Sequence, residues 1–182
     1  MNNKKVLLIA GIFVAFIQLY FPASMITEHE LTLKKGKEFR FKTAPVDPYD
    51  YFRGKYITLN YPSFRVPVVN MEELKDGQEV YAILKKDSAG FAAITAISLK
   101  KPGDNTDFVK AQIYLPYNEE KYVNVYVPFT RFYTEELKAV EAERLYNLSA
   151  GDSTLLTYAV VMVRNGNGVV KDVRVNEASL VE

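Results

Sequence analysis

The sequence predicts an α+β protein in which an N-terminal transmembrane helix precedes a β-rich antiparallel domain with one C-terminal helix packed on it. Three observations lead to this fold class. Residues 6–26 form an apolar run interrupted mainly by Gln18, Pro22 and Ser24. Most of the remaining chain consists of short segments rich in β-branched and aromatic residues, separated by Gly, Pro, Asn and Asp. One later segment, after Thr134, has apolar residues at helical spacing.

The apolar run predicts a membrane anchor. At a rise of about 1.5 Å per residue it covers roughly 30 Å, the thickness of the hydrocarbon core of a bilayer. Lys4 and Lys5 precede the run, whereas Glu28 and Glu30 follow it. Because positive flanks stay cytoplasmic, we expect residues 1–27 to be an uncleaved signal-anchor with a cytoplasmic N-terminus. Residues 28–182 are then an exported soluble domain of a single-pass protein.

A cleaved secretory signal is the alternative interpretation of this run. Cleavage after Ala23 would place Phe21 three positions before the cut, and cleavage after Ser24 would place Pro22 there. Neither residue suits a peptidase that requires small side chains, so we expect the anchor to be retained. Both interpretations deliver the domain to the same compartment.

The composition is that of an ordinary globular protein, with 48% hydrophobic residues, 25% charged residues and a net charge of +1. The sequence contains no basic block, so nucleic acid is not expected as a partner. It contains no cysteine, which excludes a disulfide framework, a thiolate zinc site, a cysteine nucleophile and a lipid attached to cysteine.

The exported part predicts a series of antiparallel strands. Turn residues at 87–90 and 165–168 each separate two strand-like segments, which predicts two hairpins. Pro67 places its segment at the edge of a sheet. The expected strands cover residues 38–43, 55–61, 66–69, 78–86, 91–99, 108–115, 122–127, 155–163 and 169–175.

One soluble helix is predicted near the C-terminus. Thr134 can cap it, the acidic residues at 135 and 136 favour its first turn, and Gly151 ends it. The most loop-like stretch of the exported part is 101–106. The exported part is therefore expected to be one domain, or two lobes that meet near residues 100–107.

The segment 46–61 carries the most specific pattern in the chain. It resembles the signature of the GDYxxLxY family, a group of bacterial membrane-anchored proteins without an assigned activity. The position of the aspartate in the family name holds Lys55 here, so an essential acid is not expected there. The resemblance extends to the whole chain and implies a membrane-anchored protein of the bacterial envelope. Together with the charged flanks, it leads us to expect the anchor in the inner (cytoplasmic) membrane and the domain in the periplasm or otherwise outside the cytoplasm. The residues that match, and that we take as the candidate motif or ligand-binding site, are Asp47, Pro48, Asp50, Arg53, Gly54, Tyr56, Leu59 and Tyr61.

Three interpretations of this motif are open. In the first, which we favour, the motif is a structural corner that leads into a strand. The corner is formed by the prolines, Gly54 and an ion pair between Arg53 and Asp47 or Asp50. In the second, the same charged residues line a pocket for a ligand or partner. The third, catalysis by the two carboxylates, is the weakest, because neither a histidine nor a nucleophile accompanies them. Along a strand, Leu59 and Tyr61 would share one face and Tyr56 would point to the other.

Other chemistry-bearing residues give weaker indications. The single histidine, His29, is expected at the surface beside the membrane, and neither a metal nor another cofactor is predicted. A Ser–Lys dyad of a signal-peptidase-like enzyme remains an alternative, although Ser24-Met25 lies inside the apolar run rather than after it. An exposed aromatic patch is expected at 117–122 or at 128–133.

The sequence thus predicts a non-catalytic, membrane-anchored envelope protein that serves as an interaction or accessory module. The expected partner is a polytopic membrane protein, which the family resemblance implies, or an envelope component. The alternative function is an envelope hydrolase or signal-peptidase-like peptidase. An interaction module should expose an apolar or aromatic surface, whereas an enzyme should gather polar groups in a cleft.

Overall fold

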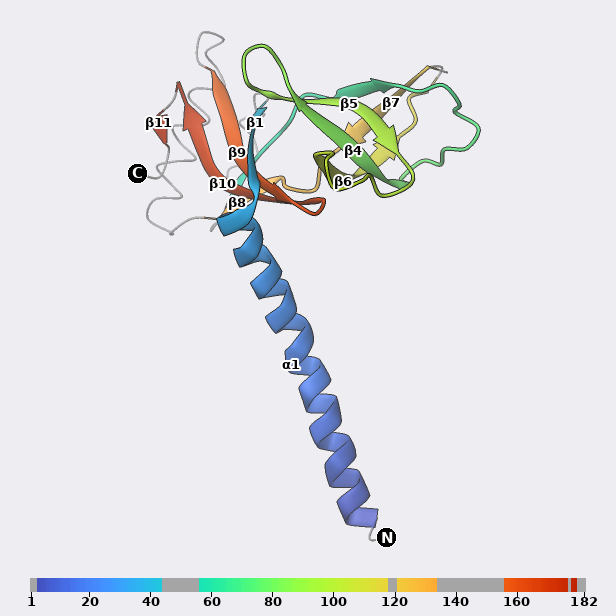
Figure 1. The fold of residues 1–182 in the computed structure, drawn as a ribbon, viewed down its shortest axis with the longest axis vertical. Helices are drawn as coiled ribbons and strands as arrows, with labels where there is room; N and C mark the ends of the chain where they lie inside the picture. Colours follow the sequence, from blue (N-terminus) through green and yellow to red (C-terminus); the bar gives the residue numbers. More distant parts are fainter. Residues whose placement is uncertain (1–2, 44–55, 118–120, 134–155, 177, 180–182) are drawn as a thin grey trace.

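A computed structural model describes residues 3–43, 56–117, 121–133, 156–176 and 178–179. One long helix, α1 (Asn3–Lys35), projects from a body made of strands (Figure 1). The strands pair antiparallel in one four-stranded, one five-stranded and one two-stranded sheet. The predicted class, a long apolar N-terminal helix followed by an antiparallel β-rich domain, is confirmed. The predicted C-terminal helix lies in residues outside those that the structure describes.

Helix α1 is long and apolar enough to cross a membrane. Its 33 residues give a length of about 50 Å. It continues past the predicted anchor at 26, because its last turns pack against the β-domain: Thr32 is 1% exposed. The helix ends where the Gly36 N–H donates to the Thr32 carbonyl oxygen at 2.9 Å. A Cβ atom on Gly36 would lie 2.4 Å from that oxygen, so only glycine fits.

The four-stranded sheet follows directly after the helix and has the order β1-β9-β10-β11. The predicted C-terminal hairpin is confirmed. Its two-residue turn has φ of 51° at Asn165 and 85° at Gly166, as a type I′ turn requires. The short β11 was not predicted, because two residues carry no periodic pattern. The strands are β1 (Lys37–Lys42), β9 (Thr157–Arg164), β10 (Asn167–Val175) and β11 (Ala178–Ser179).

The five-stranded sheet has the order β3-β7-β6-β4-β5. The predicted hairpin around residues 87–90 joins β4 and β5, and the proline-containing β3 lies at an edge, as expected. These strands are β3 (Phe64–Pro67), β4 (Glu79–Lys86), β5 (Ala92–Ser98), β6 (Phe108–Tyr114) and β7 (Tyr122–Tyr126).

The third sheet pairs β2 (Tyr56–Thr58) with β8 (Arg131–Tyr133). Strand β2 ends earlier than the predicted strand 55–61, and the chain beyond it leaves β8 to form β3 of the five-stranded sheet. Strand β8 was not predicted, because three residues carry no periodic pattern.

Both large sheets contribute to one hydrophobic core. Phe39 and Phe41 from β1 meet Val80 from β4 and Val109 from β6 in a single cluster. Two isolated bridges, Arg40 with Phe91 and Val109 with Gly166, also link the sheets. The loop around 100–107 connects β5 to β6 of the same sheet. The division into two lobes there stays a prediction.

Candidate interaction site

The candidate motif is only partly within the described residues. Asp47, Pro48, Asp50, Arg53 and Gly54 lie outside them, so neither the ion pair nor the corner is seen. Tyr56 begins β2, and the two remaining motif residues, Leu59 and Tyr61, follow that strand.

Leu59 and Tyr61 hold the segment that leads into β8. Leu59 is 1% exposed, and its N–H donates to the Thr130 carbonyl oxygen at 2.8 Å. The Tyr61 hydroxyl donates to the Phe129 carbonyl oxygen at 3.0 Å, and the two rings pack edge to face at 5.7 Å. Both side chains join the core. Their observed role is to fix the backbone at 129–130.

Phe129 is fixed from the other side by β10. Its ring lies so close to Gly168 that a Cβ atom there would be 2.5 Å from the ring carbon Cδ1. It also packs edge to face on Phe41 at 5.0 Å. Phe129 therefore connects the end of the motif segment to the four-stranded sheet.

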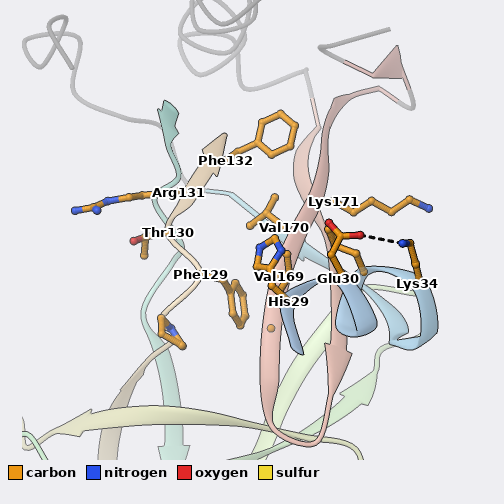
Figure 2. Close-up of a pocket in the computed structure, with 13 residues that line it drawn as sticks. His29, Glu30, Lys34, Phe129, Thr130, Arg131, Phe132, Val169, Val170 and Lys171 are labelled. Atoms are coloured by element: carbon orange, nitrogen blue, oxygen red, sulfur yellow. Dashed lines mark ion pairs between the residues drawn. The ribbon is translucent and has the colours of Figure 1, made fainter. Parts of the chain in front are cut away.

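A groove of about 840 Å³ lies where this segment, β10 and the last turns of α1 meet (Figure 2). We call it the helix-end groove. Its inner part is apolar, with Leu33, Phe129, Phe132, Val169 and Val170 among the lining residues. The remaining lining residues are His29, Glu30, Lys34, Pro128, Thr130, Arg131, Gly168 and Lys171.

Charged side chains lie at the rim of the helix-end groove. Glu30 and Lys34 form an ion pair of 3.0 Å between two exposed side chains of one helical face. Figure 2 shows Lys34 and Lys171 on one side of the groove and the Arg131 guanidinium directed away from α1 on the other. An apolar floor with a charged rim is typical of a surface that binds another macromolecule.

The groove has a defined position relative to the apolar part of α1. His29 follows the apolar run by less than one turn of helix, about 5 Å of rise. Besides the buried Thr32, a hydrogen bond of 2.7 Å from the Asn167 side-chain amide to the Glu28 carboxylate joins the helix to the β9–β10 hairpin. His29 is exposed at the surface, as expected. Within the described residues, no three His, Cys, Asp or Glu side chains form a group that could hold a metal ion.

An exposed aromatic patch at 128–133 was one of the two expectations, but the two phenylalanines of this segment are buried. Phe129 and Phe132 are 6% and 5% exposed because they pack into the core. The other expected location does expose tyrosines: Tyr117 and Tyr122 are at the surface together with Tyr114 and Tyr126 on β6 and β7. Tyr114 and Tyr126 pack edge to face at 5.0 Å, and Arg65 lies over the Tyr122 ring at 5.1 Å.

One polar cluster fastens the C-terminal edge of the four-stranded sheet. Asp172, next to a β-bulge in β10, accepts hydrogen bonds of 2.8 Å from both Ser179 Oγ and Arg174 Nε. The bond to Asp172 raises the pKa of the Arg174 guanidinium above its already high ordinary value, so this side chain stays charged. The cluster links β11 to β10 and is remote in sequence from the groove residues of α1.

These features define a class of protein in which a helix able to cross a membrane continues into an antiparallel β-domain. The chain belongs to the GDYXXLXY family, whose sequence profile matches residues 18–173, most of its length. Comparisons with curated proteins and with solved structures gave no match.

Most residues of the helix-end groove were missed by sequence reasoning. They come from three segments far apart in the chain, and no local pattern brings Leu33, Thr130 and Val169 together. Two available indications were the glycine at 168, next to the hairpin turn, and the unusual density of aromatic residues after Pro128. Taken locally, the first predicts only a hairpin turn and the second only an exposed aromatic patch.

Proposed function

We propose that this protein is a non-catalytic accessory module of the bacterial envelope, anchored in the inner membrane by α1, with its domain in the periplasm. The domain binds a polytopic membrane protein. The observation that carries this proposal is the unbroken course of α1 from its apolar part into the β-domain, which sets the helix-end groove directly beyond the apolar residues. A domain built in this way works at the membrane surface.

The orientation in this proposal follows from charge. Lysines at positions 4 and 5 precede the apolar run, and the first carboxylates, Glu28 and Glu30, come after it. The positive-inside tendency therefore favours a cytoplasmic N-terminus.

Retention of the anchor has support from the helix itself. Ala23 and Ser24, the residues at which a peptidase would cut, lie in the middle of α1, and Ser24 Oγ donates to the Phe21 carbonyl oxygen at 2.8 Å. Proteolytic cleavage favours exposed loops over hydrogen-bonded helix. The last turns of the same helix are packed against the domain, so the helix is continuous with the folded unit.

Binding is favoured over hydrolysis by the lining of the groove. Thr130 is the only hydroxyl-bearing residue that lines it within the described part of the chain, and no serine lies there beside Lys34 or Lys171. A Ser–Lys dyad therefore has no support at this site. An apolar floor suits a protein segment.

The location is tested with the full-length chain carrying a C-terminal tag in bacterial cells. We expect the tag to remain in the membrane pellet after alkaline carbonate washing and to be removed when protease is added to spheroplasts. A tag that is released from the membrane, or that the protease reaches only after lysis, would overturn the location.

The binding role is tested by crosslinking in intact membranes followed by identification of the adduct. We expect a polytopic protein to be crosslinked to the wild-type chain and lost from Val169→Glu, which places a charge on the groove floor. Tyr117→Ala, at an exposed position in the turn that follows β6, should keep it. Equal loss from both variants, with melting temperatures unchanged, would argue against the groove.

A further inference from the structure

One face of α1 runs from the apolar part of the helix into the helix-end groove. At about 100° of rotation per residue, Gly11, Ala15, Gln18, His29 and Leu33 fall within about 60° of one another. His29 and Leu33 line the groove. Because α1 is continuous over Asn3–Lys35, the part of this face at bilayer depth leads straight to the groove. We call the face formed by these five residues the Gln18 face.

Gln18 is the strongest hydrogen-bonding side chain in the apolar run. Its amide carries two donors and an acceptor, and it has no hydrogen bond to any described residue of this chain. The hydroxyls farther along α1 are satisfied within the helix: Ser24 donates to the Phe21 carbonyl and Thr27 to the Ala23 carbonyl, each at 2.8 Å. Polar side chains at this depth typically face a protein partner rather than lipid.

Pro22 adds a second unsatisfied group at the same place. An α-helix satisfies the carbonyl of each residue with the N–H four positions later, and Pro22 has no N–H to offer the Gln18 carbonyl. Gln18 therefore presents both its side-chain amide and its backbone carbonyl oxygen. In hydrocarbon, such groups need a partner, because no water is present to bond them.

We propose that the Gln18 face is the docking site for one transmembrane helix of a polytopic membrane protein, with a polar side chain of that helix opposite Gln18 and its outer end in the helix-end groove. This inference rests on the proposed function and names how the partner is held. Gly11 and Ala15 carry little side chain, so the backbones can approach closely. Phe129 and Val169 supply an apolar floor for the end of the partner helix.

A second copy of this chain fits the Gln18 face less well. The copy would carry its own β-domain on the corresponding turns of its α1. Residues 128–132 and residues 168–171 of β10 form the walls of the groove and already flank His29 and Leu33. A second β-domain at the same level of the helix would collide with these walls. A helix that ends in a short loop avoids this conflict, and helices of polytopic proteins often end in this way.

Site-specific photocrosslinking in native membranes tests the proposal. A photoreactive amino acid replaces Ala15, Leu33, Phe13 or Tyr20, one at a time, in the full-length chain. Phe13 and Tyr20 lie on the opposite side of α1. We expect the same polytopic protein at positions 15 and 33, with at least a tenfold lower yield at 13 and 20.

The contribution of Gln18 is measured in the chain with the photoreactive group at position 33. Gln18→Leu should reduce the adduct at least tenfold, whereas Gln18→Asn, which keeps an amide, should retain a large part of it. Ser24→Ala is the matched control, since it removes a polar group that is bonded within α1 and faces the opposite side. Unchanged melting temperatures of the variants confirm that the domain is folded.

Several results would overturn the docking site. An adduct at position 15 with the mass of two copies of the chain would assign the face to self-association. Adducts with lipid alone at 15 and 33 would exclude a helix. A polytopic protein crosslinked equally at 13 and 20, or unaffected by Gln18→Leu, would refute this face while leaving the accessory role intact. The absence of a polytopic protein at all four positions and from general crosslinking would refute both the docking site and the accessory role.

Discussion

The hydroxyl of Tyr61 donates a 3.0 Å hydrogen bond to the carbonyl oxygen of Phe129, residues that are far apart in the chain. Tyr61 is the last residue of the family motif, and Phe129 lines the helix-end groove. The motif therefore supports the shape of the groove even where it does not line it. This relationship gives the first prediction.

Tyr61→Phe removes this hydrogen bond and keeps the ring. The free energy of unfolding should fall by about 1 kcal/mol, the usual net value of such a bond. For a chain of this size the melting temperature should fall by roughly 2–4 °C. Thermal unfolding of the full-length protein in detergent, followed by circular dichroism, measures it. Tyr117→Phe, at a side chain 94% exposed, should melt like the wild type. Equal melting of all three proteins would contradict the prediction.

Gly168→Ala should destabilise the protein by about 1–3 kcal/mol, because the new Cβ would overlap the Phe129 ring and force it to move. Gly103→Ala is the matched control, since a Cβ atom there meets nothing within 4 Å. Chemical denaturation measures both. In a double-mutant cycle, Phe129→Leu should cost less in the Gly168→Ala background than alone. Additive costs would show that the two residues are not coupled.

Unequal effects are expected at the two turn residues of the β9–β10 hairpin. Gly166→Ala places a side chain at φ 85° and 2.8 Å from the Phe108 ring, so it should cost at least about 1 kcal/mol. It should also weaken the bond of 2.8 Å from the Lys110 N–H to the Gly166 carbonyl, which links the two large sheets. Asn165→Gly, at φ 51°, should change the stability by no more than a few tenths of a kcal/mol. Similar losses in both variants would refute the assigned turn geometry.

Thr32 tests the connection between helix and domain. Thr32→Val keeps the buried volume and removes only the hydroxyl that donates to the Glu28 carbonyl at 2.8 Å, so its effect should be at most about 1 kcal/mol. Thr32→Lys buries an unpaired charge and should cost several kcal/mol. Hydrogen exchange of the β9 and β10 amides should rise in the lysine variant alone. Lys35→Thr, at an exposed position, serves as the control, and similar exchange in all variants would show that α1 is not packed there.

Asp172→Ala removes the acceptor shared by Ser179 and Arg174. We expect the β11 amides to exchange faster in the variant than in the wild type, while exchange at β1 and β9 stays unchanged. The reason is that few other contacts hold β11 at the edge of the sheet. Asp104→Ala, in the exposed loop before β6, is the control. Faster exchange throughout the sheet would instead indicate a global loss of stability.

The sequence predicted the elements that have strong local patterns. The alternation at 38–43 corresponds to β1, and the Asn-Gly turn at 165–166 corresponds to the β9–β10 hairpin, because period-two burial and positive φ are dictated locally. The apolar run likewise specified a helix long enough for a membrane. What this information could not specify is which distant segments meet.

The end of α1 shows why the remainder was missed. Residues 28–35 mix charges with Leu31, Thr32 and Leu33, a pattern that ends a membrane span in sequence terms. The helix continues because Thr32 is buried against the β-domain, a tertiary effect that no local pattern contains. The groove depends on the same long-range packing, through Gly168 against Phe129.

The connection between α1 and β1 through Gly36 alone has a mechanical consequence. With no spacer, the rotation of the β-domain about the axis of α1 is set by the helix, residue by residue. One alanine inserted directly after Ile26 would rotate the β-domain by about 100° around the helix axis and shift it by about 1.5 Å along that axis. In the membrane location proposed above, the length of α1 therefore determines which neighbouring membrane protein the β-domain faces.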